Sequence, residues 1–289
     1  MRPITWFLGL LMTFSGPICA CAENKPSWVL ELGYHTTETF KIWRGQQGMP
    51  FVELEIGNSA QRCLFDTGNM VGIGLASNVL DQLNLPETGR WSRLDDGGQV
   101  IGVNRQFRAP KVYLLGRSLS DQAIFEFSIP GLVGTIGPDT LPGTRFTLDY
   151  QAELLAVTKS QLGVIPPGFI ALPLIRSTRH PRLILTMAHV NGKPVLISLD
   201  TGASRTNIDP RLVHDLALPM GQHGASIDSI QIGTLVFSVP SAKVISKAGI
   251  DPTLTPSIQL TLGSDILAQM VLTVDYTTGQ LLIRDARKR

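Results

Sequence analysis

The chain carries the same short motif twice, each time at the end of a largely apolar run. Asp66-Thr67-Gly68 follows Cys63-Leu64-Phe65, and Asp200-Thr201-Gly202 follows Leu196-Ile197-Ser198-Leu199. Each copy indicates a buried strand that ends in a tight turn, because glycine permits backbone conformations that other residues avoid. A carboxyl group at the inner end of such a strand is costly to bury unless hydrogen bonds or a shared proton relieve its charge. Two equivalent half-domains that face each other would let the two carboxyl groups do this.

The surroundings of the motif also repeat in the same order, which indicates a duplicated fold. Strands are expected at residues 51–56 and 183–190, and each is followed by a turn that contains glycine. Helices are expected at residues 77–85, capped by Ser77 or Asn78, and at residues 209–216, capped by Asp209. Twelve positions separate Gly137 from Asp149, and twelve also separate Gly263 from Asp275. Two matched segment pairs carry this spacing: Thr135–Leu141 with Thr261–Leu267, and Thr147–Tyr150 with Thr273–Tyr276.

The repeat and the composition together define the expected fold class. The 289 residues include 28 Gly and 19 Pro, which favours many short strands over long helices. A chain of this length can form two domains with substantial cores. We therefore expect an all-β protein with two homologous lobes and a cleft between them. The expected lobes are residues 23–158 and 170–289, joined by a linker at residues 159–169.

The first 22 residues have the layout of a secretory signal peptide. Arg2 precedes an apolar stretch that is too short to span a membrane, and a small-residue cleavage site follows, with cleavage expected after Ala22. This predicts a secreted or periplasmic protein. Alternatively, the residues before Cys21 resemble a loose bacterial lipoprotein box, which would leave the protein lipid-anchored through Cys21. Cleavage after Ala22 would leave Cys63 as the one cysteine, and its apolar surroundings predict a buried thiol.

Residues 23–48 precede the first strand that belongs to the repeat. They could form a short pro-segment, or a strand that completes a sheet shared by the two lobes. The aromatic residues Trp28, Phe40 and Trp43 favour packing against the body of the protein, and therefore the second interpretation. Short strands are expected at residues 28–30 and 40–43.

The duplicated motif in its repeated context resembles the two-lobed aspartic endopeptidases of the pepsin and retropepsin clan. Asp66-Thr67-Gly68 and Asp200-Thr201-Gly202 match the two catalytic triplets of that clan. The clan also has an apolar-apolar-Gly element after each triplet. Its matches here are Leu132-Val133-Gly134 or Thr135-Ile136-Gly137 in the first half and Thr261-Leu262-Gly263 in the second. The resemblance covers nearly all of residues 50–285.

The resemblance implies a chemistry and a set of site residues. Asp66 and Asp200 would share one proton and activate a water molecule that hydrolyses a peptide bond, without a metal ion, a cofactor or a covalent intermediate. Thr67 and Thr201 would form hydrogen bonds across the dyad, and Gly68 and Gly202 would let the substrate backbone come close. The substrate would be a peptide or protein. Both lobes lie in one chain, so a monomer is expected to suffice.

The sequence departs from the pepsin pattern at three places. Asn69 and Ala203 stand where pepsin-like lobes carry Ser or Thr after the triplet glycine. Because the amide of Asn69 can donate a hydrogen bond, we hypothesise that it makes Asp66 the more readily ionised partner. The first half also lacks a Tyr between Asn69 and Lys111, and residues 95–98 predict a glycine-tipped hairpin over the cleft instead.

Three functions agree with this sequence. The first is an active endopeptidase, and the second is a catalytically silent relative that binds peptides in the same cleft. The third is the same fold kept for protein interaction in the cell envelope. The net charge of +2 is too small to suggest a nucleic acid or a membrane surface as partner. The chain lacks the Gly-x-Ser-x-Gly and His-Glu-x-x-His motifs, and its five histidines are scattered.

Overall fold

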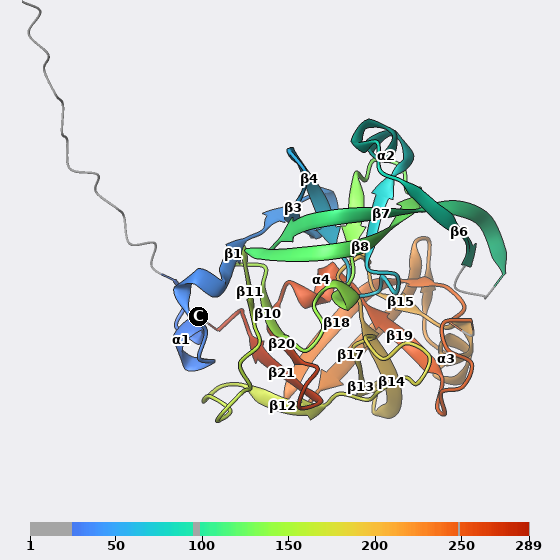
Figure 1. Cartoon of the computed structure of the whole chain (residues 1–289). Helices are drawn as coiled ribbons and strands as arrows, with labels where there is room; N and C mark the ends of the chain where they lie inside the picture. The colour runs from blue at the N-terminus through green and yellow to red at the C-terminus, as the bar shows by residue number, and fades with distance from the viewer. Residues whose placement is uncertain (1–24, 95–98, 248, 289) are drawn as a thin grey trace, which may run out of the picture.

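The structure is a computed structural model that describes residues 25–94, 99–247 and 249–288 (Figure 1). The described chain is built mainly from strands that form three sheets, so the predicted all-β class is confirmed. The expected signal peptide at residues 1–22, with Cys21, lies outside the described residues. The expected hairpin tip at residues 95–98 also lies outside them.

A six-stranded sheet contains strands from both halves of the sequence. Its central pair, β10 and β20, runs antiparallel and places Thr147 opposite Thr273, two residues matched by the repeat. Their hydroxyl oxygens are 2.7 Å apart. The strand order is β1 (Thr39–Lys41), β11 (Leu154–Thr158), β10 (Arg145–Asp149), β20 (Met270–Asp275), β21 (Gln280–Asp285) and β12 (Ile170–Pro173).

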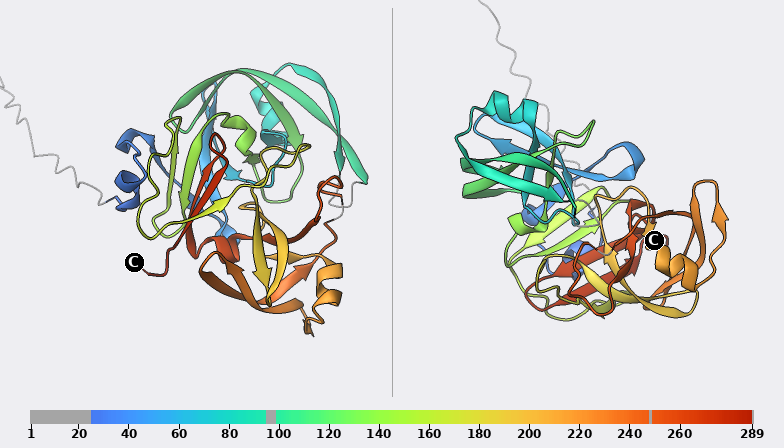
Figure 2. Two further views of the ribbon diagram at one scale, coloured as in Figure 1. Left: turned by 90° about the horizontal axis from the view of Figure 1, so that it is seen from below. Right: turned by 90° about the vertical axis from the view of Figure 1, so that its right-hand side faces the viewer.

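Most of the remaining strands of the first half form an eight-stranded sheet on one side of the shared sheet (Figure 2). Strands β6 and β7, which flank the hairpin tip predicted at residues 95–98, pair antiparallel. The strand order is β2 (Trp43–Arg44), β3 (Pro50–Ile56), β4 (Ser59–Phe65), β9 (Gly134–Ile136), β5 (Ile73–Ala76), β8 (Arg117–Phe127), β7 (Val100–Leu114) and β6 (Glu87–Leu94).

The second half forms a seven-stranded sheet on the other side, drawn in yellow to orange in Figure 2. In both halves the strand that leads into the Asp-Thr-Gly motif has a parallel neighbour, β9 beside β4 and β19 beside β14. The strand order is β13 (Leu185–Val190), β14 (Lys193–Leu199), β19 (Ile258–Leu262), β15 (Asn207–Ile208), β18 (Leu235–Val244), β17 (Gly224–Ile232) and β16 (Met220–Gly221).

The helices are short. They are α1 (Trp28–Glu31), α2 (Ser77–Leu83), α3 (Pro210–Asp215) and α4 (Ser264–Leu267), with 3₁₀ turns at Thr36–Glu38, Gln46–Gly48 and Pro138–Thr140. Helix α3 begins as predicted, because the Asp209 side chain accepts a hydrogen bond from the Arg211 N–H. The predicted cap of α2 is wrong: Ala76 is the N-cap residue, and Ser77 Oγ donates to Glu126 instead. In the parts of the chain that are described, no helix has the length and apolar character needed to cross a membrane.

The segment before the repeat is part of the shared sheet. Strand β1 pairs with β11, as the second interpretation of residues 23–48 predicted. The expected strand at residues 28–30 is wrong, because these residues belong to α1. Trp28 is fully buried, and its indole N–H donates to Asp149 Oδ2 at 2.8 Å. Burial also raises the pKa of the Cys63 thiol to about 12, in agreement with its predicted packing role.

Candidate active site

The two Asp-Thr-Gly motifs meet where β4 of the eight-stranded sheet and β14 of the seven-stranded sheet end, although 134 positions separate them in sequence. A Cβ atom added to Gly68 would lie 2.6 Å from Cγ of Asp200, and one added to Gly202 would lie 2.3 Å from Cγ of Asp66. Only glycine fits at both positions, because each motif packs its backbone against the carboxyl group of the other. The two carboxyl groups are within hydrogen-bond reach of each other, and both aspartates are partly exposed.

The two threonines connect the motifs by reciprocal hydrogen bonds. The N–H of Thr67 donates to Oγ1 of Thr201, and the N–H of Thr201 donates to Oγ1 of Thr67, each at 3.0 Å. The hydroxyl of Thr67 donates to the carbonyl of Leu199 at 2.9 Å, and that of Thr201 donates to the carbonyl of Phe65. Both threonines are buried. The cross-dyad bonds that the resemblance implied are therefore present, and they fix the relative position of the two aspartates.

The two carboxyl groups have different electrostatic surroundings. Burial raises the pKa of Asp66 well above the ordinary value, and the charge of Asp200 and the hydrogen bond to it raise it further. Burial also raises the pKa of Asp200. The Gly202 N–H, 2.8 Å from Oδ1, the hydrogen bond from Asp66 and the charge of Lys247 oppose that rise. The N–H groups of Gly68 and Asn69 likewise oppose the rise in the pKa of Asp66. The Lys247 charge is therefore the main difference, and it favours ionisation of Asp200 in a pair that shares one proton.

Asn69 does not act as the sequence suggested. Its side-chain amide donates to the carbonyl of Gly72 and to Oγ1 of Thr135, both at 2.9 Å. Its carbonyl oxygen accepts the N–H of Val71, also at 2.9 Å. Both amide protons are thus used away from the dyad, and the hypothesis that Asn69 makes Asp66 the more readily ionised partner is wrong. The side chain holds its own loop in shape instead.

Ala203, the counterpart of Asn69, has no polar side-chain atom. The loop after the second triplet is held by hydrogen bonds of its backbone instead. Its carbonyl accepts the N–H of Ser264 at 2.7 Å. The Ser264 hydroxyl donates to the carbonyl of Thr201 at 3.2 Å. The loop after each triplet is therefore held without a side-chain hydroxyl at the position next to the triplet glycine.

Two cavities lie beside the dyad, one against each motif. The first has a volume of about 60 Å³ and is bordered by Thr67 and Asn69. The second has a volume of about 760 Å³ and is bordered by Gly202 and Ala203. A chain that crosses the two carboxyl groups would enter a cavity on either side.

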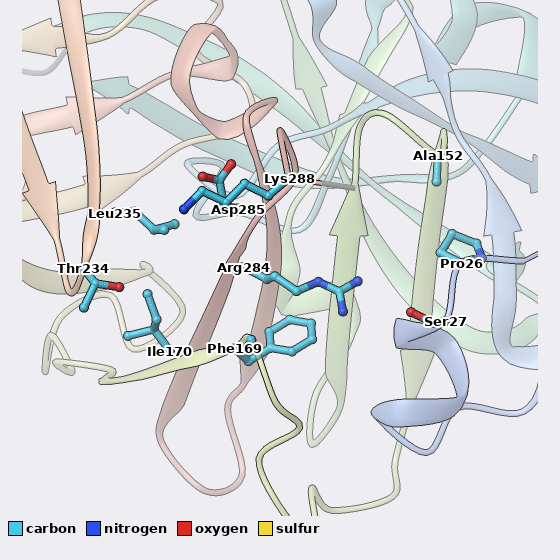
Figure 3. Close-up of a pocket in the computed structure, with 11 residues that line it drawn as sticks. Pro26, Ser27, Ala152, Phe169, Ile170, Thr234, Leu235, Arg284, Asp285 and Lys288 are labelled. Carbon is cyan, nitrogen blue, oxygen red and sulfur yellow. The ribbon is translucent and has the colours of Figure 1, made fainter.

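A cavity larger than either of these lies elsewhere. Its volume is about 910 Å³, and it opens between α1, the β20–β21 hairpin and the start of β12 (Figure 3). Arg284 stacks over the ring of Phe169 there, with 4.7 Å between the guanidinium carbon and the ring centre. No residue of either Asp-Thr-Gly motif lines it. Cavity size alone would therefore misplace the candidate site.

Several charged residues beside the dyad were not anticipated from the sequence. Arg179, His180 and Arg182 come from the loop before β13 and line the smaller cavity. In the repeat, this loop corresponds to the segment around Gln47 before β3, which lines the larger cavity. An alignment of the two halves of the repeat is therefore the one sequence signal that would have indicated that both loops lie beside the dyad. Lys247, which is buried and acts electrostatically on Asp200, follows β18 and had no signal in the sequence.

Within the described ranges, no group of three or more His, Cys, Asp or Glu side chains is arranged to hold a metal ion. No protein-family model matches the chain, and a search of curated proteins found no match.

Proposed function

We propose that this chain is an aspartic endopeptidase with two pepsin-like lobes and a catalytic cleft between them. The observation that carries the proposal is the meeting of Asp66 and Asp200, each at the end of a strand in its own half of the internal repeat. The reciprocal threonine bonds and the two close-packed glycines support it, because they hold the carboxyl groups at a distance that favours one shared proton. The lobes correspond to the eight-stranded and seven-stranded sheets, which the shared sheet joins.

The difference between the two carboxyl groups assigns their roles in this mechanism. Ionised Asp200 acts as the general base that takes a proton from the attacking water, and protonated Asp66 donates its proton to the oxygen of the scissile carbonyl. The resulting tetrahedral intermediate collapses when Asp200 passes the acquired proton to the leaving nitrogen. The C–N bond breaks, one hydroxyl of the tetrahedral intermediate returns its proton to Asp66 as the product carboxyl group forms, and the pair again holds one proton.

The test is cleavage of denatured casein by the wild type, Asp66→Asn and Asp200→Asn from acid to neutral pH. We expect cleavage by the wild type and a loss of at least about a thousandfold in each variant, since each removes one partner of the proton transfer. Asp121→Asn is the matched control, because Asp121 is an exposed residue of β8 that forms an ion pair with Arg108 and belongs to neither motif. Cleavage that survives in either dyad variant would contradict the proposal.

The second candidate is a peptide-binding protein of the same fold without catalysis. The absence of a hydroxyl next to the triplet glycine in both loops favours it, since neither Asn69 nor Ala203 supports a carboxylate with its side chain. A wild type that binds casein-derived peptides but cleaves none at any pH would establish this function in place of the first. The predicted secretion, with its lipid-anchored alternative, remains a prediction for either candidate.

A further inference from the structure

The smaller cavity beside the dyad has an unpaired cation. Arg182 Nε lies 3.7 Å from Asp139 Oδ1, and the Arg182 guanidinium also stacks on the ring of Tyr276. Arg179 lines the same cavity and has no ion pair or side-chain hydrogen bond with any described residue. Burial and the charge of Arg179 lower the pKa of His180, so this imidazole adds no charge near neutral pH. The cavity therefore keeps one surplus positive charge, which is carried by Arg179.

The larger cavity shows the same imbalance. Arg205 and Lys243 line it, both exposed, and within the described chain neither forms an ion pair. The one carboxylate in the lining is Asp265, and its oxygens accept the N–H of Thr206 at 3.0 Å and its hydroxyl at 2.8 Å. The Asp265 carboxylate is thus engaged with Thr206, and the two cations remain available to a ligand.

We propose that the cleft selects peptide segments with Asp or Glu side chains on both sides of the dyad, one reaching Arg179 and another reaching Arg205 and Lys243. The inference rests on the proposed function, because it assumes that a peptide crosses the two carboxyl groups. The volume of about 60 Å³ beside Arg179 agrees with it. A dry cavity that holds a benzene ring measures about 150 Å³, so this one suits a carboxylate better than an aromatic side chain.

The state of the dyad is compatible with acidic substrates. Both dyad pKa values are raised, so the singly protonated pair exists at a pH above the ordinary carboxyl range. This upward shift moves the singly protonated state toward the pH range in which substrate Asp and Glu side chains, with pKa values near 4, become ionised. Ionised substrate side chains would then be attracted to the two cavities in the pH range in which the dyad is singly protonated. Lys247 adds a further positive charge near Asp200.

The experiment starts from the best cleavage site found in denatured casein. Peptides with that sequence are made with Glu or with Gln at each of three positions on either side of the cut, and kcat/KM is measured. We expect Glu to be favoured about twofold to fivefold at one or more positions on each side, the range of a solvent-accessible ion pair. The preference should shrink when the salt concentration rises from about 0.01 M to about 1 M.

Variants assign the preference to the two cavities. Arg179→Gln should remove it on one side of the cut only, and Arg205→Gln with Lys243→Gln on the other side only. Arg62→Gln is the matched control, because Arg62 stacks on Trp43 and lines neither cavity. Equal kcat/KM for Glu and Gln peptides, or a preference that all variants keep, would overturn the inference and leave the endopeptidase proposal standing.

Absence of cleavage by the wild type would overturn the proposed function instead. The inference is then decided by binding, measured as the fluorescence anisotropy of two labelled peptides that differ only by Glu in place of Gln. A tighter Kd for the Glu peptide that Arg179→Gln and Arg205→Gln abolish would support an acidic-peptide site. Equal Kd values would overturn it.

Discussion

Thr201→Val tests whether the reciprocal hydrogen bonds hold the two halves together at the dyad. Oγ1 of Thr201 accepts the N–H of Thr67 at 3.0 Å and donates to the carbonyl of Phe65, and the side chain is fully buried. Valine keeps the shape but leaves both backbone groups without a partner. Each unsatisfied group costs about 1–3 kcal/mol, so the free energy of unfolding should fall by about 2–6 kcal/mol. This is a large part of a typical total of about 5–15 kcal/mol.

The assay is urea unfolding followed by tryptophan fluorescence, with two controls. Thr201→Ser keeps the hydroxyl and should lose only about 1 kcal/mol, for the missing methyl group. Thr186→Val removes a single buried hydrogen bond, to the carbonyl of Pro173, and should lose about half as much as Thr201→Val. A loss below about 1 kcal/mol for Thr201→Val, or an equal loss for the Ser and Val variants, would refute the reasoning.

Three further predictions concern the dyad and the N-terminal segment. Lys247→Met should move the acid limb of the pH–rate profile to higher pH, because the Lys247 charge opposes the rise in the pKa of Asp200; an unmoved limb would contradict this. Asp66→Asn should raise the free energy of unfolding at neutral pH, measured in urea. A carboxyl group whose folded pKa is raised loses its stabilisation as the pH rises through that pKa, and Asn has no proton to lose. Trp28→Phe should cost about 2–5 kcal/mol in the same assay, from the lost hydrogen bond to Asp149 and the cavity left behind; a near-wild-type midpoint would show that α1 does not contribute to the fold.

Local patterns predicted several of the strands correctly. The alternation of apolar and acidic residues in β3 and the glycine turns at Gly57 and Gly192 depend on neighbouring residues, so the sequence carries their full signal. The cap of α3 by Asp209 is equally local. The apolar run at Trp28 became a helix turn instead of a strand, because three residues are too few to distinguish the two periodicities.

The sequence was less informative for polar side chains that could form hydrogen bonds with several different partners. The side-chain amide of Asn69 could have donated a hydrogen bond to Asp66, but in the structure it donates to the carbonyl of Gly72 and to Oγ1 of Thr135. Ser77 likewise reached Glu126 on β8 in place of capping α2. In both cases a contact between distant strands decided the outcome, and no local pattern contains that contact.

The sequence by itself determined that the protein is duplicated, that it is all-β, and that two equivalent aspartates end two equivalent strands. Those features follow from short-range spacing and from the repeat. Only the tertiary structure decided how the surroundings of the two carboxyl groups differ, because their pKa values depend on burial and on charges such as Lys247, which lies far from either motif in sequence. It also decided that Arg179 and Lys243 lie beside the dyad, since segments far apart in sequence meet there only after the sheets have packed.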